Sequence, residues 1–153
     1  MSLSALIDRE AITTDLQALE KEEVIRELID LLEKTGKVKD KNQVVNELLE
    51  REAKGSTGLE KGIAVPHVKT SAVDELCIAI GISKEGVEFG AIDGKYSYIF
   101  FLILAPRGAA AQHIEVLSEI MTFVTPPINR ERLKKANSPD GVIQIIQEYE
   151  NNI

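Results

Sequence analysis

The two histidines of this chain, His67 and His113, carry the side chains best suited to chemistry near neutral pH. His67 follows Pro66 at the end of a short apolar stretch, where a chain leaves a sheet and a side chain can point into a cleft. His113 lies near the start of an expected helix, whose dipole disfavours a charged imidazolium, lowers its pKa and favours a nearby anion. One hypothesis is that both histidines meet around a phosphate. The simpler interpretation is one surface histidine and one partly buried core histidine.

The loop that follows the second expected helix is another candidate for anion binding. Its glycines, at positions 55, 58 and 62, match neither glycine pattern of the nucleotide-binding loops. Its flexible backbone amides and the hydroxyls of Ser56 and Thr57 can still cradle an anion, although an ordinary helix-to-strand loop has the same composition. Arg51 comes just before this loop. It is either a partner of the helix's C-terminal carbonyls or a phosphate contact.

Composition limits the classes of function that remain. The length of 153 residues, with 44% apolar and 28% charged residues, suits a single domain over residues 1–153. A formal net charge of −7 argues against binding to nucleic acid or to an anionic membrane. Cys77 alone cannot form an intrachain disulfide, and two histidines without an acidic partner at ligand spacing make a weak metal site. The longest apolar run, Tyr98 to Ala105, is too short to span a bilayer, and the N-terminus lacks a signal-peptide pattern, so we expect a cytoplasmic protein.

Apolar residues at helical spacing predict two helices in the first third of the chain. The first follows Leu19 and ends at Thr35-Gly36. The second begins at Asp40, whose carboxylate can cap it while Gln43 reaches back as in a capping box. Gly55 is the expected end of this helix.

The last third of the chain is also expected to be helical. A helix starts near Ala109, ends before Pro126-Pro127, and has an apolar face made of Ile114, Leu117, Met121 and Val124. A short basic helix from Arg130 to Lys135 follows. Ser138-Pro139 then opens the final helix as a cap and first-turn pair.

The middle of the chain is typical of strands. Candidate strands are Ala11 to Leu16 at an edge, Ile63 to Val65, Leu76 to Ile82 with Cys77 in the core, and the apolar run Tyr98 to Leu104 at the centre of the sheet. Lys84-Glu85-Gly86 and Asp93-Gly94-Lys95 are turn signals that favour antiparallel pairing. We therefore expect an α/β three-layer sandwich, a mixed β-sheet flanked by helices on both faces.

The order of motifs from Leu48 to His113 resembles the enzyme IIA domain of the bacterial phosphoenolpyruvate-dependent sugar phosphotransferase system, fructose and mannitol class. The matching segments are Leu48-Leu49-Glu50-Arg51-Glu52, Gly55-Ser56-Thr57-Gly58, Gly62-Ile63-Ala64-Val65-Pro66-His67, Lys84-Glu85-Gly86-Val87-Glu88-Phe89, Asp93-Gly94, Phe100-Phe101-Leu102-Ile103, Ala105-Pro106 and His113-Ile114-Glu115-Val116-Leu117. The flanking helices also agree, so the resemblance covers nearly the whole chain. One departure is Val68, where many members of the family have Gly or Ala.

The resemblance implies a phosphoryl carrier. His67 would accept phosphate from the phosphocarrier protein HPr and pass it to a cysteine of enzyme IIB, with His113 and Arg51 at the same active centre. Thr57 and Gly58 would then donate hydrogen bonds to phosphate oxygens. The resemblance implies no nucleotide, metal or organic cofactor. It also leaves open a regulatory role like that of the nitrogen-related enzyme IIA proteins, in which phosphorylation of His67 switches the binding of partner proteins.

Overall fold

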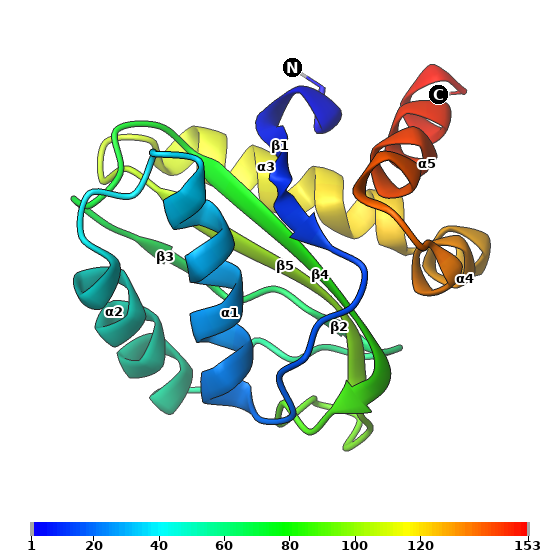
Figure 1. Cartoon of the computed structure of the whole chain (residues 1–153), viewed down its shortest axis with the longest axis horizontal. Helices are drawn as coiled ribbons and strands as arrows, with labels where there is room; N and C mark the ends of the chain where they lie inside the picture. Colours follow the sequence, from blue (N-terminus) through cyan, green and yellow to red (C-terminus); the bar gives the residue numbers. More distant parts are fainter. Residues whose placement is uncertain (1, 153) are drawn as a thin grey trace.

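The structure, a computed structural model, describes residues 2–152, and its centre is a five-stranded mixed sheet (Figure 1). The strands, in spatial order, are β1 (Ile7–Thr13), β4 (Cys77–Val87), β5 (Ser97–Ala105) and β2 (Ile63–Ala64), and β3 (His67–Lys69) also pairs with β5. β4 and β5 are antiparallel, whereas β1 runs parallel to β4, and β2 and β3 run parallel to β5.

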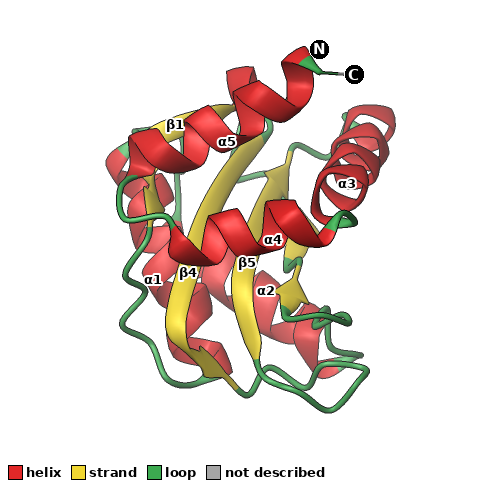
Figure 2. Cartoon of the chain, turned by 90° about the vertical axis from the view of Figure 1, so that its right-hand side faces the viewer, coloured by secondary structure: helices red, strands yellow, loops and turns green. Residues whose placement is uncertain are grey.

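Helices cover both faces of this sheet. One face carries α1 (Lys21–Lys34) and α2 (Lys41–Ala53); the other carries α3 (Ala110–Val124), α4 (Pro127–Lys135) and α5 (Pro139–Asn151), and a short 3-10 helix, η1 (Ser4–Leu6), precedes β1 (Figure 1, Figure 2). Successive residues of β5 alternate between the two faces. Phe101 packs with α3 to α5, while Phe100 and Leu102 pack with α1 and α2. The predicted three-layer α/β sandwich is confirmed.

The side chains expected to cap α2 and α5 do so, but the expected capping box at α2 does not form. The Asp40 carboxylate accepts the backbone N–H of Gln43 at 3.1 Å, and the Ser138 hydroxyl accepts that of Gly141 at 3.0 Å. Gln43 does not complete a capping box, because its side-chain amide donates to Ser71 Oγ at 2.9 Å. A tertiary partner therefore replaces the expected local one.

Two of the expected strand limits are wrong. The edge strand is β1, which begins at Ile7 and ends at Thr13, earlier than expected. Lys84 to Gly86 form no turn, because β4 continues through them to Val87 with an irregular register. Gly86 has φ 86°, and a β-carbon there would lie 2.8 Å from the ring of Tyr98, so this glycine serves a bulge and a close contact.

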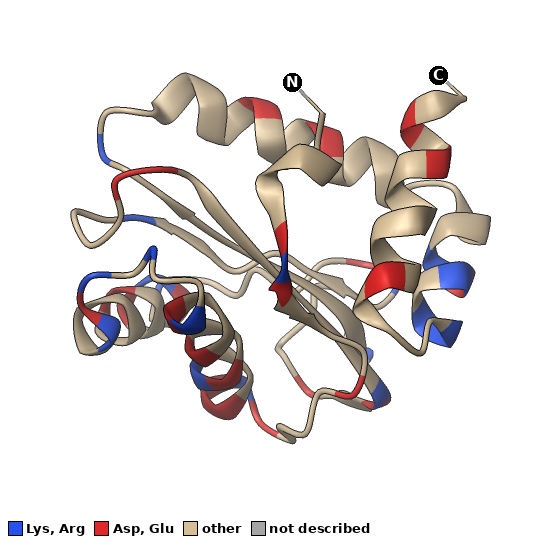
Figure 3. Cartoon of the chain, turned by 45° about the horizontal axis from the view of Figure 1, so that its top comes forward, with Lys and Arg blue, Asp and Glu red and all other residues tan. Residues whose placement is uncertain are grey.

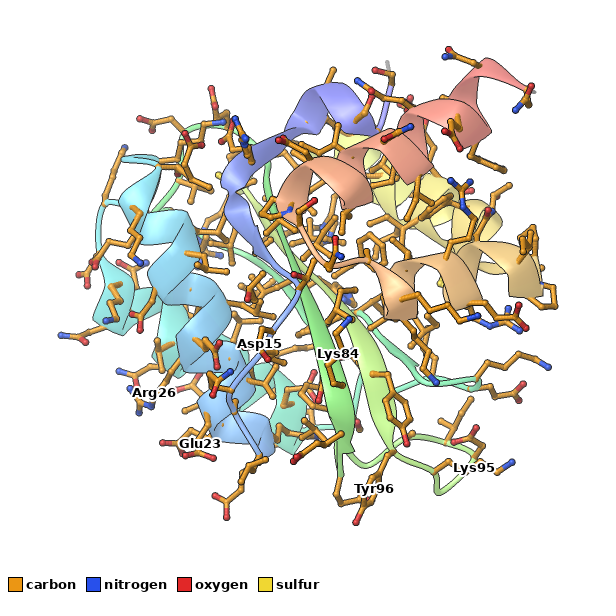
Figure 4. The ribbon with its side chains drawn as sticks, turned by 45° about the vertical axis from the view of Figure 1, so that its right-hand side comes forward. Asp15, Glu23, Arg26, Lys84, Lys95 and Tyr96 are labelled. Carbon is orange, nitrogen blue, oxygen red and sulfur yellow. The ribbon has the colours of Figure 1, made fainter. Side chains whose placement is uncertain are left out.

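Lys84 ties this irregular end of β4 to the helical layer. Its Nζ donates to the carbonyl oxygens of Lys134 and Ala136, each at 2.8 Å, where α4 ends. Figure 4 labels Lys84 on β4, and labels Lys95 and Tyr96 just before β5 begins. The second expected turn, Asp93-Gly94-Lys95, lies in the connection from β4 to β5, where the N–H of Gly94 donates to the carbonyl oxygen of Ala91 at 2.9 Å.

The expected apolar face of α3 is partly correct, because Val124 is buried and Leu117 packs against the core, but Ile114 and Met121 do not belong to it. Ile114 is 69% exposed and Met121 37% exposed, whereas His113, Val116, Ile120 and Phe123 are buried. α3 has apolar residues on both sides, so its periodicity fits two neighbouring stripes equally well. The sheet selects the stripe that contains His113, and Ile114 is left on the surface.

Candidate functional site

His67 is held in place by the sheet. β2 and β3 pair with β5 in one continuous register, with Ile63 opposite Ile99 and His67 opposite Ile103. Val65 and Pro66 interrupt the strand between them, because proline has no N–H for the ladder. The Pro66 carbonyl still accepts the N–H of Ile103 at 2.9 Å. The backbone on either side of the histidine is therefore fixed to the same strand.

A backbone carbonyl determines which ring nitrogen of His67 carries the proton. Nδ1 of His67 lies 2.7 Å from the carbonyl oxygen of Val65. A carbonyl oxygen only accepts hydrogen bonds, so this contact requires a proton on Nδ1. In the neutral ring the lone pair is then on Nε2. His67 thus has a nucleophilic nitrogen on the side of the ring away from the backbone.

His113 lies beside His67, so the structure brings the two predicted histidines together. Their ring centroids are 5.2 Å apart and the rings meet edge to face at 74°. Burial lowers the pKa of His113, and the nearby positive charges of His67 and Lys69 lower it further. His113 Nε2 is buried without a hydrogen-bond partner among the described residues. A buried polar nitrogen is costly unless it is hydrogen-bonded, so His113 Nε2 is a candidate contact for a polar group beside His67.

The departure at Val68 does not obstruct the histidine pair. Successive side chains of a strand point to opposite faces, so Val68 faces away from His67. It packs against the apolar cluster under α1 and α2, on the other side of the sheet from α3. The β-branched side chain therefore fills core rather than the space around the rings.

Arg51 and Gly58 have partners of their own. Arg51 Nη1 donates to the Gly55 carbonyl at 2.8 Å, just beyond the end of α2, which fits its interpretation as a helix-end cation. The N–H of Gly58 donates to Ser56 Oγ at 3.0 Å, and a β-carbon on Gly58 would lie 2.9 Å from Ala91 Cα. The glycine at 58 is required by this close backbone approach.

Thr57 is bonded to a residue that the sequence analysis did not single out. Its backbone N–H donates to Glu52 Oε1 at 3.2 Å, and its hydroxyl donates to Glu52 Oε2. Lys21 Nζ donates to the same carboxylate at 2.9 Å, and the Glu52 side chain is only 3% exposed. Phosphate binding by Thr57 and Gly58 stays a prediction, because their donors have protein partners here.

A signal for Glu52 was present in the sequence. Glu52 lies in the last turn of α2, where the helix dipole disfavours a negative charge. A glutamate at such a place needs a compensating cation or several donors. Lys21 and Thr57 supply both, from α1 and from the loop after α2.

The described residues show two further negative findings. Between residues 2 and 152 no helix is long and apolar enough to cross a membrane. Within the same range no group of three or more His, Cys, Asp or Glu side chains is arranged to hold a metal ion.

Cys77 is buried, which raises the pKa of its thiol to about 11, as expected for a core cysteine.

The fold as a whole is that of solved enzyme IIA proteins. The nitrogen regulatory protein IIA-Ntr from Neisseria meningitidis has a TM-score of 0.87 at 30% identity, over 94% of this chain and 98% of that one. The IIA mannitol domain in a complex with phosphorylated IIB mannitol from Escherichia coli has a TM-score of 0.79 at 27% identity, over 93% of this chain and 97% of that one.

The chain belongs to the family described as phosphoenolpyruvate-dependent sugar phosphotransferase system, EIIA 2, which matches residues 5–149. Members of this family act as phosphotransferase components. The fructose-specific EIIABC component of Bacillus subtilis is 37% identical over 98% of this chain, which spans only 24% of that protein. The fructose-specific EIIA component of Haloferax volcanii is 34% identical over 95% of each. The sequence resemblance is thus confirmed at the level of the family.

Proposed function

We propose that the chain is a phosphoryl carrier in which His67 Nε2 accepts a phosphoryl group from HPr and passes it to a cysteine of an enzyme IIB. The observation that carries this proposal is the 2.7 Å contact between His67 Nδ1 and Val65 O. Nε2 attacks the phosphorus in line as the bond to the donor breaks, and the electron pair of that bond stays on the donor. The ring becomes positive, and the Nδ1–H bond to the carbonyl stabilises that charge.

His113 supports the same reaction as a neutral donor. Its lowered pKa keeps the ring uncharged near neutral pH, so it does not repel the ring of His67 as that ring becomes positive. Its buried Nε2, when protonated, can donate to an oxygen of the transferring group and so satisfy the orphaned atom. Arg51 contributes positive charge from the end of α2.

The direct test is phosphorylation of the purified chain by phosphoenolpyruvate, enzyme I and HPr, followed by intact mass. One added phosphoryl group supports the carrier proposal. Addition of enzyme IIB then separates transport from regulation, because a transport component gives up the group to the IIB cysteine. Retention of the group by His67 would favour the regulatory alternative, which the similarity to IIA-Ntr also supports.

Arg51→Lys is expected to slow transfer by roughly tenfold if Arg51 contacts the phosphoryl group, since an ammonium lacks the planar fork that engages two oxygens. The measurement is the rate of phosphorylation by phosphorylated HPr. Arg26→Lys is the matched control, because Arg26 lies exposed on α1 (Figure 4) and its ion pair among the described residues is with Glu22. Equal rates for both variants and the wild type, with unchanged melting temperatures, would leave Arg51 a helix-end cation.

An exposed apolar surface on α3 fits the docking of HPr and IIB. It comprises Ile114 and Met121, with Ile92 from the loop after β4. Leu59 and Val124 join Ile92 and Met121 around a hollow of about 300 Å³. The sequence of α3 contains Glu115 and Glu119 but neither lysine nor arginine, and Figure 3 accordingly shows acidic positions and no blue along this helix. Because Ile114 adjoins His113 in the chain, a partner on this apolar α3 surface would approach the histidine pair.

Ile114→Glu is expected to slow transfer by roughly tenfold at low partner concentration and much less at saturation, because it weakens docking without touching the rings. The measurement is the dependence of the transfer rate on HPr concentration. Leu19→Glu is the control: Leu19 is 64% exposed but lies before α1, on the other face of the sheet. An equal loss in the two variants would contradict docking on the apolar α3 surface.

A further inference from the structure

Glu52 is a buried carboxylate to which the proposed transfer chemistry gives no role. It accepts Lys21 Nζ at 2.9 Å, the N–H of Thr57 at 3.2 Å and the hydroxyl of Thr57. Its side chain is 3% exposed and that of Lys21 is 29% exposed. A carboxylate removed from water in this way is stable only because all three donors point at it.

The three donors come from two residues on different elements. Lys21 begins α1, Glu52 lies in the last turn of α2 and Thr57 lies in the loop after α2. Lys21 Nζ also lies 4.7 Å from the centre of the Phe89 ring, and the Phe89 carbonyl accepts the Ser56 hydroxyl at 2.6 Å. The loop is therefore fixed at Ser56 and at Thr57, on two different neighbours.

From Thr57 a short series of backbone contacts leads to the ring of His67. The Thr57 carbonyl accepts the N–H of Val65 at 3.1 Å. The carbonyl of the same Val65 meets His67 Nδ1 at 2.7 Å. Thr57 thus holds Val65 at its N–H, and the carbonyl of the same residue, in the next peptide unit, determines the proton position on His67.

We propose that Glu52 is a positioning residue which, through Thr57 and Val65, holds His67 in the tautomer that leaves Nε2 free to accept a phosphoryl group. The inference rests on the proposed carrier function for its catalytic consequence only. The tautomer itself is a property of the unphosphorylated chain. If the Val65 carbonyl moves away, the proton can occupy Nε2, and the nucleophilic lone pair is then lost from that nitrogen.

The test is nitrogen-15 NMR of the imidazole ring in uniformly labelled protein without phosphorylation. The wild type is expected to show a protonated Nδ1 and an unprotonated Nε2 on His67. Glu52→Gln keeps the size of the side chain but loses the charge that pairs with Lys21 and replaces one of the two oxygens that accept from Thr57 by an NH2 donor. We expect a mixture of both tautomers in this variant and transfer from phosphorylated HPr slower by on the order of tenfold.

Glu47→Gln is the matched control. Glu47 lies on the same helix and its carboxylate also accepts a threonine hydroxyl, that of Thr70 at 2.6 Å, but within residues 2–152 no hydrogen bond leads from it to Val65. It is expected to lower the melting temperature by a similar amount and to leave the His67 tautomer unchanged. Thr57→Val, which removes one donor to Glu52 with little change of shape, provides a second variant should Glu52→Gln fail to fold.

The outcomes separate this inference from the carrier proposal. A wild-type tautomer in both Glu52→Gln and Thr57→Val would overturn the positioning role, whatever happens to stability. A changed tautomer in a chain whose wild type takes no label from HPr would uphold the positioning role and reject the carrier function. Equal tautomer changes in Glu47→Gln and Glu52→Gln would reduce Glu52 to a general structural residue.

Discussion

His67→Ala is expected to abolish phosphoryl uptake while leaving the fold intact. The wild type should gain one phosphoryl group from phosphorylated HPr, and the group should be acid-labile and base-stable, as expected for a P–N bond. The variant should gain none. His113, the other histidine, has a lowered pKa but is buried, and among the described residues no backbone carbonyl holds its ring in the way that Val65 holds His67.

Intact mass and the far-UV circular dichroism of the variant provide the two measurements. His67 is half-buried at the start of β3, and β3 is held by its backbone pairing with β5, so alanine removes no ladder hydrogen bond. His113→Ala, taken through the same incubation, is the control that must still be labelled. Stoichiometric labelling of His67→Ala, or an acid-stable phosphate on the wild type, would reassign the acceptor.

His113→Ala is expected to slow transfer by roughly 100-fold without preventing it, the usual cost of losing one preorganised donor to the transition state. The measurement is the single-turnover rate of transfer from phosphorylated HPr to the variant and onward to IIB. Unchanged rates in both directions would remove His113 from the reaction.

Folding stability gives an independent check on the state of the His113 ring. Its pKa is lowered from 6.5 in the folded chain, so the unfolded chain binds the extra proton first as the pH falls. The wild type should therefore lose stability between about pH 8 and about pH 5 through this group, and His113→Ala should lack that part of the loss. Urea unfolding of both proteins at the two pH values measures the difference.

The parts of the fold that could be predicted from the sequence are those set by local chemistry. Asp40 and Ser138 begin their helices because each side chain caps a free amide, and this needs no knowledge of the rest of the molecule. The apolar run that becomes β5 indicates a strand covered on both faces, which it is. The histidine of the Pro-His pair was singled out for its position at the end of a strand.

The parts that could not be predicted depend on tertiary contacts, which choose between structures that the local sequence permits equally well. α3 has apolar residues on two adjacent stripes, and only the sheet decides that His113 turns inward and Ile114 outward. The sequence Lys84-Glu85-Gly86 predicts a turn, but Gly86 lies in a bulge of β4, against the ring of Tyr98. The charge of Glu52 at a helix end is explained only by its ion pair with Lys21, 31 residues away, together with the hydroxyl of the nearby Thr57.

The attachment of His67 to the sheet has a consequence for how fast such a carrier can work. The residue belongs to the same hydrogen-bonded ladder as β5, rather than to a lid that must open and close. If His67 is the carrier, no internal rearrangement then has to precede each transfer, and the interval between transfers would be set by how often partners bind the proposed apolar α3 surface and leave it. Throughput in the cell would follow the abundance of the partners and the viscosity of their surroundings.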